Sequence, residues 1–317
     1  MNIEAIIEKS LMLLEEKRKE YFMSALKIIS GIYILYFAFV TYAVMQSLPI
    51  SLPVLIISGF FVMLIAFIIV TLIKSNKFTA YYKEALITPL VGQLFPELTY
   101  DAKGHISEID FERSSLFRGF NRYYGDDYFE GTINGNQISF SELYVAQESR
   151  RNHGTSSTRV IFKGVFAQLK CSSLSVSKPI TIKANRGEVF NVLPSFIKGF
   201  IEKFMPDYGP QITIGDSAFD SEYTVHCDDE ALVHELITDE FIAGLNSLTD
   251  RAEALYDKKE MQSTASIRFA GNEIFIAIPS KEIFTVRFYR SLLGTKDSII
   301  QYCDLVKELM NFAKIFK

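Results

Sequence analysis

The densest group of candidate metal ligands lies around His226 and His234, with Glu230 between them. Glu230 and His234 are four residues apart, so they share one face of a predicted helix, and His226 ends the strand expected before it. Imidazole and carboxylate groups can form a mixed nitrogen and oxygen metal site. Acidic residues at a helix start are also explained by capping alone, so both interpretations stay open at this point.

A second group of carboxylates lies on two strands of a predicted hairpin. Asp126 and Asp127 precede the first strand, Glu130 lies within it, and Ser141 and Glu142 lie on the second. Paired carboxylates can carry out general acid–base chemistry when their surroundings separate their pKa values. The alternative is a turn at the two aspartates and a structural role for the others. We regard Asp126, Asp127 and Glu142 as candidate interaction residues.

A polar stretch at residues 147–157 is predicted to be a loop and carries Arg150, Arg151 and His153. Guanidinium groups on such a loop could bind an anion or a carboxylate of a partner, or the loop could simply be solvated. We include Arg150 and Arg151 among the candidate interaction residues.

No catalytic motif is present in the sequence. A phosphate-binding GxxxxGK[ST], a GxSxG, an HExxH and a dinucleotide fingerprint are all missing. Cys171, Cys227 and Cys303 are isolated, without a CxxC or a histidine at ligand spacing. We therefore expect free thiols in a reducing compartment, no cofactor and no assignable catalytic residue.

Residues 28–73 contain no Asp, Glu, Lys, Arg or His. At about 20 residues per span, this length suits two membrane helices joined at Pro49 and Pro53, because proline disfavours helix in the residue before it. We expect spans near residues 27–45 and 52–73. A buried hairpin in a soluble core is the alternative, but the apolar side chains face all round each predicted helix.

Basic residues flank both predicted spans, whereas the connection between them carries no charge. Lys17, Arg18, Lys19 and Lys27 precede the first span, and Lys74, Lys77 and Lys83 follow the second. By the positive-inside rule, both termini face the cytoplasm. The sequence thus predicts a multi-pass protein of a bacterial inner membrane, with the lipid bilayer as its first partner.

The remaining residues are numerous enough for one large or two small cores. The formal net charge of −4 argues against a nucleic-acid partner, because phosphate binding needs concentrated Lys and Arg. Residues 1–26 read as an amphipathic helix that runs into the first span. Its balanced charges favour packing on the protein's own domain or on another copy over lying in the membrane.

Residues 74–94 continue as a helix, and short strands, caps and turns follow. Ser107 is expected to cap a helix through Phe117, and the Asn134-Gly135 pair predicts a hairpin. A helix is predicted over 191–204, a strand over 284–289 and a closing helix over 297–316. Hairpin-joined strands with segregated helices indicate an α+β fold with a mainly antiparallel sheet. The predicted domains are an amphipathic helix (1–26), a two-helix transmembrane hairpin (27–74) and a cytoplasmic α+β domain (75–317).

A series of short motifs between about residues 78 and 280 is similar to a known family. The series includes Pro89-Leu90-Val91, Gly104-His105-Ile106-Ser107, Tyr123-Tyr124-Gly125-Asp126-Asp127, Phe162-Lys163-Gly164-Val165-Phe166 and Phe219-Asp220-Ser221-Glu222-Tyr223. The chain resembles DUF3137, bacterial membrane proteins of unknown function with an N-terminal transmembrane hairpin. The resemblance implies location and architecture but no activity and no catalytic residues.

Our leading hypothesis is a non-enzymatic inner-membrane protein with a cytoplasmic domain for protein interaction or self-assembly. Two helices alone bury little surface, so we expect a homo-oligomer, with a possible protein partner through the N-terminal helix or the cytoplasmic domain. A membrane-anchored sensor or effector of a small ligand is the alternative. A metal-dependent hydrolase using His226, Glu230 and His234 is a further one.

Overall fold

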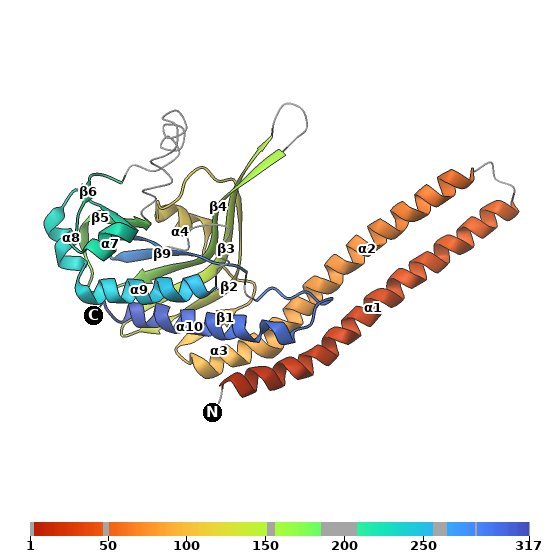
Figure 1. The fold of residues 1–317 in the computed structure, drawn as a ribbon, viewed down its shortest axis with the longest axis horizontal. Coiled ribbons are helices and arrows are strands. Elements are labelled where there is room, and N and C mark those ends of the chain that lie inside the picture. The colour runs from red at the N-terminus through yellow and green to blue at the C-terminus, as the bar shows by residue number, and fades with distance from the viewer. Residues whose placement is uncertain are drawn as a thin grey trace. The chain divides into compact units, whose positions relative to one another are not determined.

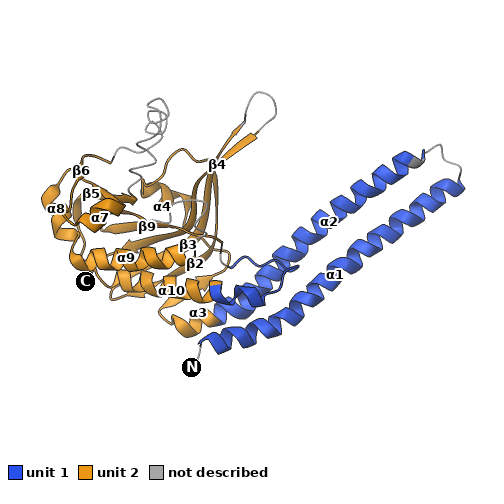
Figure 2. Cartoon of the chain, in the orientation of Figure 1, with its two compact units in different colours: residues 1–89, 284–297 blue, residues 90–283, 298–317 orange. Residues whose placement is uncertain are grey.

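The computed structural model describes residues 3–46, 51–150, 156–184, 208–255, 265–282 and 284–316 (Figure 1). The chain divides into two compact units, coloured separately in Figure 2. Unit 1 comprises residues 1–89 and 284–297, and unit 2 comprises residues 90–283 and 298–317. The predicted boundaries at residues 26 and 74 depend on membrane insertion and stay a prediction.

Unit 1 is built on two long helices, α1 (Ile3–Met45) and α2 (Leu52–Tyr82). The amphipathic N-terminal segment runs into the first apolar segment without a break. α1 and the helical stretch Pro53–Leu94 are long and apolar enough to cross a membrane, and only 6% of the apolar window of each is buried. Pro53 lies in the first turn of α2, where its missing N–H removes no helical hydrogen bond.

The two helices contact each other through a hydroxyl group and a glycine. Tyr36 on α1 donates a 2.5 Å hydrogen bond to the carbonyl of Leu55 on α2 and lies 2.8 Å from Ser58 Oγ. A Cβ atom at Gly59 would lie 2.9 Å from the Tyr36 ring. Small and hydroxyl-bearing residues thus allow the close approach of the helices.

The end of the second long helix changes its hydrogen-bond pattern next to a proline. The π-helix η1 (Lys83–Ile87) follows α2 and leads into α3 (Thr88–Leu94). The backbone N–H of Thr88 donates to the carbonyl of Lys83. Pro89 has no N–H to offer the preceding turn, and the wider π turn accommodates it.

Residues 284–297 return to unit 1 as an irregular segment that ends in the short helix η2 (Leu293–Thr295). The strand predicted over 284–289 is therefore wrong. The carbonyls of Val286 and Phe288 accept hydrogen bonds from Thr79 and Arg18. Side chains of the two helices thus take the place of a neighbouring strand.

Unit 2 contains a sheet in which all pairs of described strands are antiparallel, in the order β1-β2-β3-β4-β9-β8-β5-β7-β6. The strands are β1 (Leu98–Asp101), β2 (Arg122–Ile133), β3 (Asn136–Arg150), β4 (Ser156–Lys170), β5 (Val176–Ala184), β6 (Gln211–Ile212), β7 (Tyr223–His226), β8 (Ser266–Gly271) and β9 (Glu273–Pro279). The predicted α+β fold with a mainly antiparallel sheet is confirmed.

Helices cover both faces of this sheet. α9 (Asp239–Ala254) and α10 (Lys296–Ala313) lie side by side over one face, where the rings of Phe241, Phe269 and Phe312 are in contact (Figure 1). α4 (Glu108–Arg113) places Phe111 on the other face, against Phe166. α7 (Ser217–Glu222) and α8 (Glu230–Leu236) flank β7.

Local turn and cap signals place several of these elements. Ser107 caps α4 by accepting from the N–H of Asp110, although the helix ends at Arg113 and not at Phe117. Asn134 and Gly135 both have positive φ, as the tight turn between β2 and β3 requires. The loop predicted over 147–157 is partly wrong, because 147–150 and 156–157 are paired strand. The helix predicted over 191–204 lies outside the described residues.

Candidate functional site

The structure brings together Asp126, Asp127 and Glu142, three of the residues that the sequence singled out. One carboxylate oxygen from each lies within 4.8 Å of the others. Asp126 is opposite Glu142 in the β2–β3 ladder, and a register shift follows between Asp126 and Phe129. Asp127 lies in this bulge with a φ of +56°, a conformation that aspartate tolerates better than most residues.

This acidic cluster lies inside unit 2, on the sheet face that α10 covers. Asp127 is 1% exposed and Glu142 is 6% exposed. The hydroxyl of Tyr100 on β1 donates to Asp127 Oδ1. Burial and the negative charge of Asp127 raise the pKa of Tyr100 well above its ordinary value. Tyr302 on α10 is fully buried, and burial followed by the charge of Glu142 raises its pKa in the same way.

The cluster has the oxygen donors that a hard divalent cation prefers. Burial of the Asp127 and Glu142 carboxylates, however, leaves no access for a substrate at these two groups. The bond from Tyr100 also uses one of the oxygens that a cation would need. The arrangement is that of a polar group inside the core, which joins β1, β2 and β3.

Glu130 and Ser141, the other two residues of the predicted carboxylate group, make different contacts. Glu130 accepts a 3.1 Å hydrogen bond from the hydroxyl of Tyr128. Ser141 Oγ accepts from the backbone N–H of Ile106 at 3.0 Å, which holds the segment before α4 against β3. Glu130 and Ser141 therefore take structural roles apart from the acidic cluster.

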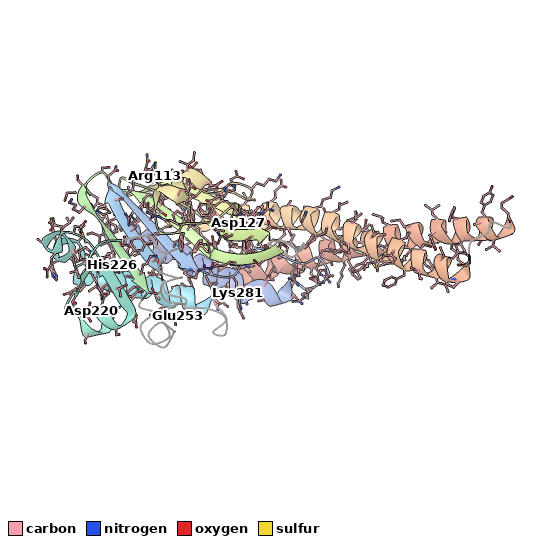
Figure 3. All side chains as sticks on the ribbon, turned by 90° about the horizontal axis from the view of Figure 1, so that it is seen from above. Arg113, Asp127, Asp220, His226, Glu253 and Lys281 are labelled. Atoms are coloured by element: carbon pink, nitrogen blue, oxygen red, sulfur yellow. The ribbon has the colours of Figure 1, made fainter. Side chains whose placement is uncertain are left out.

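His226, Glu230 and His234 do not form a converging set of ligands in the described part of the chain. His234 Nε2 lies 3.8 Å from Glu230 Oε1 on exposed α8. The Nδ1 of His226 lies 3.1 Å from the carbonyl of Gly209 instead. Asp229 caps α8 by accepting from Leu232, which is the capping role that the sequence left open. Figure 3 labels His226 and Asp127, which lie in separate parts of unit 2.

Of the two arginine candidates, Arg150 lies at the end of the β3–β4 hairpin. Arg150 is the last residue of β3 and pairs with Ser156, the first of β4. Arg151 and His153 lie outside the described residues. Arg150 therefore lies in a strand and not in the predicted loop.

The three cysteines are buried free thiols. Burial raises the pKa of Cys171 to about 11 and that of Cys303 to about 12. A thiol is reactive as its thiolate, so these two groups are poor nucleophiles at neutral pH.

A group of cations around one aromatic ring was missed by the sequence reasoning. Lys183 Nζ lies 4.3 Å, and Arg268 Cζ 5.6 Å, from the centre of the Tyr208 ring. The sequence gives no signal that separates Arg268 from an ordinary outward-facing residue, because it alternates with the apolar Ile267 and Phe269. The pairing of β5 with β8, which sequence spacing does not reveal, brings Lys183 beside it.

The comparisons with known proteins bear on the C-terminal half of the chain. Residues 160–317 match the family model described as "Protein of unknown function (DUF3137)". No curated protein and no solved structure matches the chain.

Proposed function

Residues 160–317 of this chain belong to the DUF3137 family of proteins of unknown function, and we propose that the chain is a membrane-anchored protein that acts by binding and not by catalysis. In this proposal α1 and α2 span a bacterial inner membrane. Unit 2 is then a cytoplasmic domain that binds another protein or further copies of the chain. The absence of any catalytic motif from the sequence supports binding over catalysis.

The observation that best supports a membrane anchor is the exposure of large apolar side chains on both long helices. Leu35 and Phe37 on α1 are 72% and 63% exposed, and Ile56 and Phe60 on α2 are each 65% exposed. Water disfavours an apolar surface of this extent. Lipid accepts it, and a helix satisfies its own backbone hydrogen bonds there.

Basic side chains at one end of the helix pair support the orientation. Lys74 on α2 donates a 2.7 Å hydrogen bond to Ser24 on α1, so the flanks of the two apolar segments lie together. Lys27 on α1 and Lys77 on α2 add positive charge near this end. By the positive-inside rule this end faces the cytoplasm.

The N-terminal helix offers less support for partner binding than its sequence suggested. Ile7, Leu11 and Leu14, which form its apolar stripe, are buried within the chain. Most of the large apolar side chains that are exposed among the described residues lie on the two long helices, which favours self-association in the membrane. We therefore place the homo-oligomer contacts on α1 and α2, and any contact with another protein on unit 2.

Topology is tested with single added cysteines, because the native thiols are buried. Lys9→Cys and Ser51→Cys place exposed thiols in the N-terminal part of α1, ahead of its apolar segment, and directly before α2. A membrane-impermeant maleimide should label Ser51→Cys in intact cells and Lys9→Cys only in inverted vesicles. Recovery of the chain in the soluble fraction, or the reverse labelling pattern, would contradict the proposal.

Binding is tested by purifying the tagged full-length chain from its own membranes in mild detergent. Native mass spectrometry should find either a homo-oligomer or a complex with a co-purified protein in fixed proportion. The same measurement in lipid nanodiscs controls for dissociation in detergent. A monomer without a partner under both conditions would rule out binding to proteins as the function.

A further inference from the structure

Two positively charged side chains lie on the same face of the sheet in unit 2, on neighbouring strands. Thr181 on β5 is directly opposite Arg268 on β8. Lys183 is two residues after Thr181, and residues two apart on a strand share a face. Both cationic groups lie within about 6 Å of the centre of the Tyr208 ring, the range of cation–π attraction.

Hydrogen bonds fix the members of this group. Lys183 Nζ and the hydroxyl of Tyr208 donate to the same carbonyl, that of Leu116, at 3.3 and 2.8 Å. Arg268 Nη1 donates to Thr181 Oγ1 at 2.7 Å. Four segments that are distant in the sequence are thus held in one place.

A second arginine, Arg118, belongs to the segment whose Leu116 carbonyl accepts from Lys183 and Tyr208. Arg118 is exposed and follows Leu116 by two residues. Burial lowers the pKa of Arg268, the electrostatic interaction with Tyr208 raises it in part, and the positive charge of Arg118 lowers it further. Among the described residues, neither arginine makes an ion pair with a carboxylate, whereas Arg113 and Arg122 on the same unit both do.

Like charges gathered at a half-buried place repel one another, and an anion between them would offset the repulsion. Guanidinium groups present several N–H donors in a plane, a geometry that matches the oxygens of phosphate. Arg118 is exposed, so an anion that binds its guanidinium can reach it from solvent.

We propose that Arg118, Lys183 and Arg268 bind a phosphate group, either free or carried by a small molecule as a phosphate monoester. Three positive charges suit the dianion of phosphate better than a single carboxylate. This inference concerns unit 2 alone and does not depend on whether α1 and α2 span a membrane.

The test is calorimetric titration of the full-length chain in neutral detergent at constant ionic strength. Inorganic phosphate, phenyl phosphate and acetate are the probes. Arg268→Gln and Arg118→Gln are the variants, and the second changes an exposed residue and so leaves the fold intact. Arg122→Gln is the matched control, since Arg122 is exposed and paired with Glu148.

We expect at least one of the two phosphate compounds to bind the wild-type chain and the control variant. The dissociation constant for each site variant should be at least about tenfold higher. Tighter binding of phenyl phosphate would identify a monoester as the ligand class, and equal or tighter binding of inorganic phosphate would identify the free anion. No phosphate binding, phosphate binding by either site variant as tight as by the wild-type chain, or acetate binding as tight as phosphate would overturn the proposal.

Discussion

Arg18 on α1 donates a 2.7 Å hydrogen bond from Nη1 to the carbonyl oxygen of Phe288, 270 positions later in the chain. The same guanidinium forms a two-point contact with Glu15, at 2.7 and 3.0 Å. Glu15 in turn accepts from the backbone N–H of Leu292 at 3.0 Å. Two side chains one turn apart on α1 thus fix the return segment 284–297 within unit 1.

Removing this contact should loosen the return segment. Arg18→Gln takes a charged donor from a pair whose side chains are only 12% and 14% exposed, so we expect a loss of about 1.5–3 kcal/mol in local stability. Hydrogen exchange read by mass spectrometry should report faster exchange at residues 286–292. Lys17→Gln is the control, because the exposed Lys17–Glu20 pair contributes little. Unchanged exchange in Arg18→Gln would show that the segment is held by other contacts.

The same contact should respond to acid. Burial alone would raise the pKa of Glu15, but hydrogen bonds from Arg18 and Leu292 outweigh it, so the pKa lies below its ordinary value of 4.5. The stabilisation is therefore present above pH 4.5 and is lost as the pH falls from there through the folded-state pKa. Exchange at 286–292, corrected for its intrinsic pH dependence, should rise in that window. In Glu15→Gln this rise should be absent, and a rise of the same size there would assign it to another group.

Tyr100→Phe should destabilise unit 2 through the acidic cluster. The substitution removes one donor from the buried carboxylate of Asp127, and a hydrogen bond to a charged group contributes about 1.5–3 kcal/mol. Thermal unfolding should show a lower Tm. Tyr124→Phe is the control, because Tyr124 is 56% exposed and should change the stability by less than about 0.5 kcal/mol. Equal Tm values for the two variants would mean that the hydroxyl of Tyr100 is not needed.

Gly164→Ala should disrupt the pairing of β4 with β9. Gly164 has a φ of +152°, and an added Cβ would lie 2.1 Å from the carbonyl oxygen of Ile278. Because the obstacle is backbone, we expect a cost of at least about 3 kcal/mol, seen as a large fall in Tm or loss of folded protein. Gly92→Ala in α3 meets nothing within 4 Å and should be stabilising by roughly 0.5–1 kcal/mol. Normal folding of Gly164→Ala would contradict the strand register at this point.

The cysteines should be inert until the chain unfolds. With the pKa of Cys303 raised to about 12 by burial, its thiolate is scarce at neutral pH. The native protein should therefore react slowly with a maleimide, and all three thiols should react after denaturation. Rapid labelling of the native chain, located by peptide mapping, would identify a thiol that becomes exposed in solution.

Local signals in the sequence determined many elements of this protein. Alternation and the Asn134-Gly135 turn placed the β2–β3 hairpin, and Ser107 placed the start of α4, because caps and tight turns depend on residues close in the chain. The uncharged run over residues 28–73 likewise gave the long apolar helices, since length and composition suffice for that prediction.

Only the tertiary structure decided what the remaining segments contact. Phe284, Val286 and Phe288 are buried at alternate positions, as in a strand, but the carbonyls of Val286 and Phe288 accept from helix side chains. Apolar residues at every second position indicate which side chains are buried, but they do not indicate which groups form hydrogen bonds with the backbone. The cation group arose in the same way, because Thr181 and Arg268 are 87 positions apart and meet through a β5–β8 pairing. The sequence by itself thus determined helices, turns and an antiparallel sheet, whereas long-range strand pairing decided which charged side chains share a site.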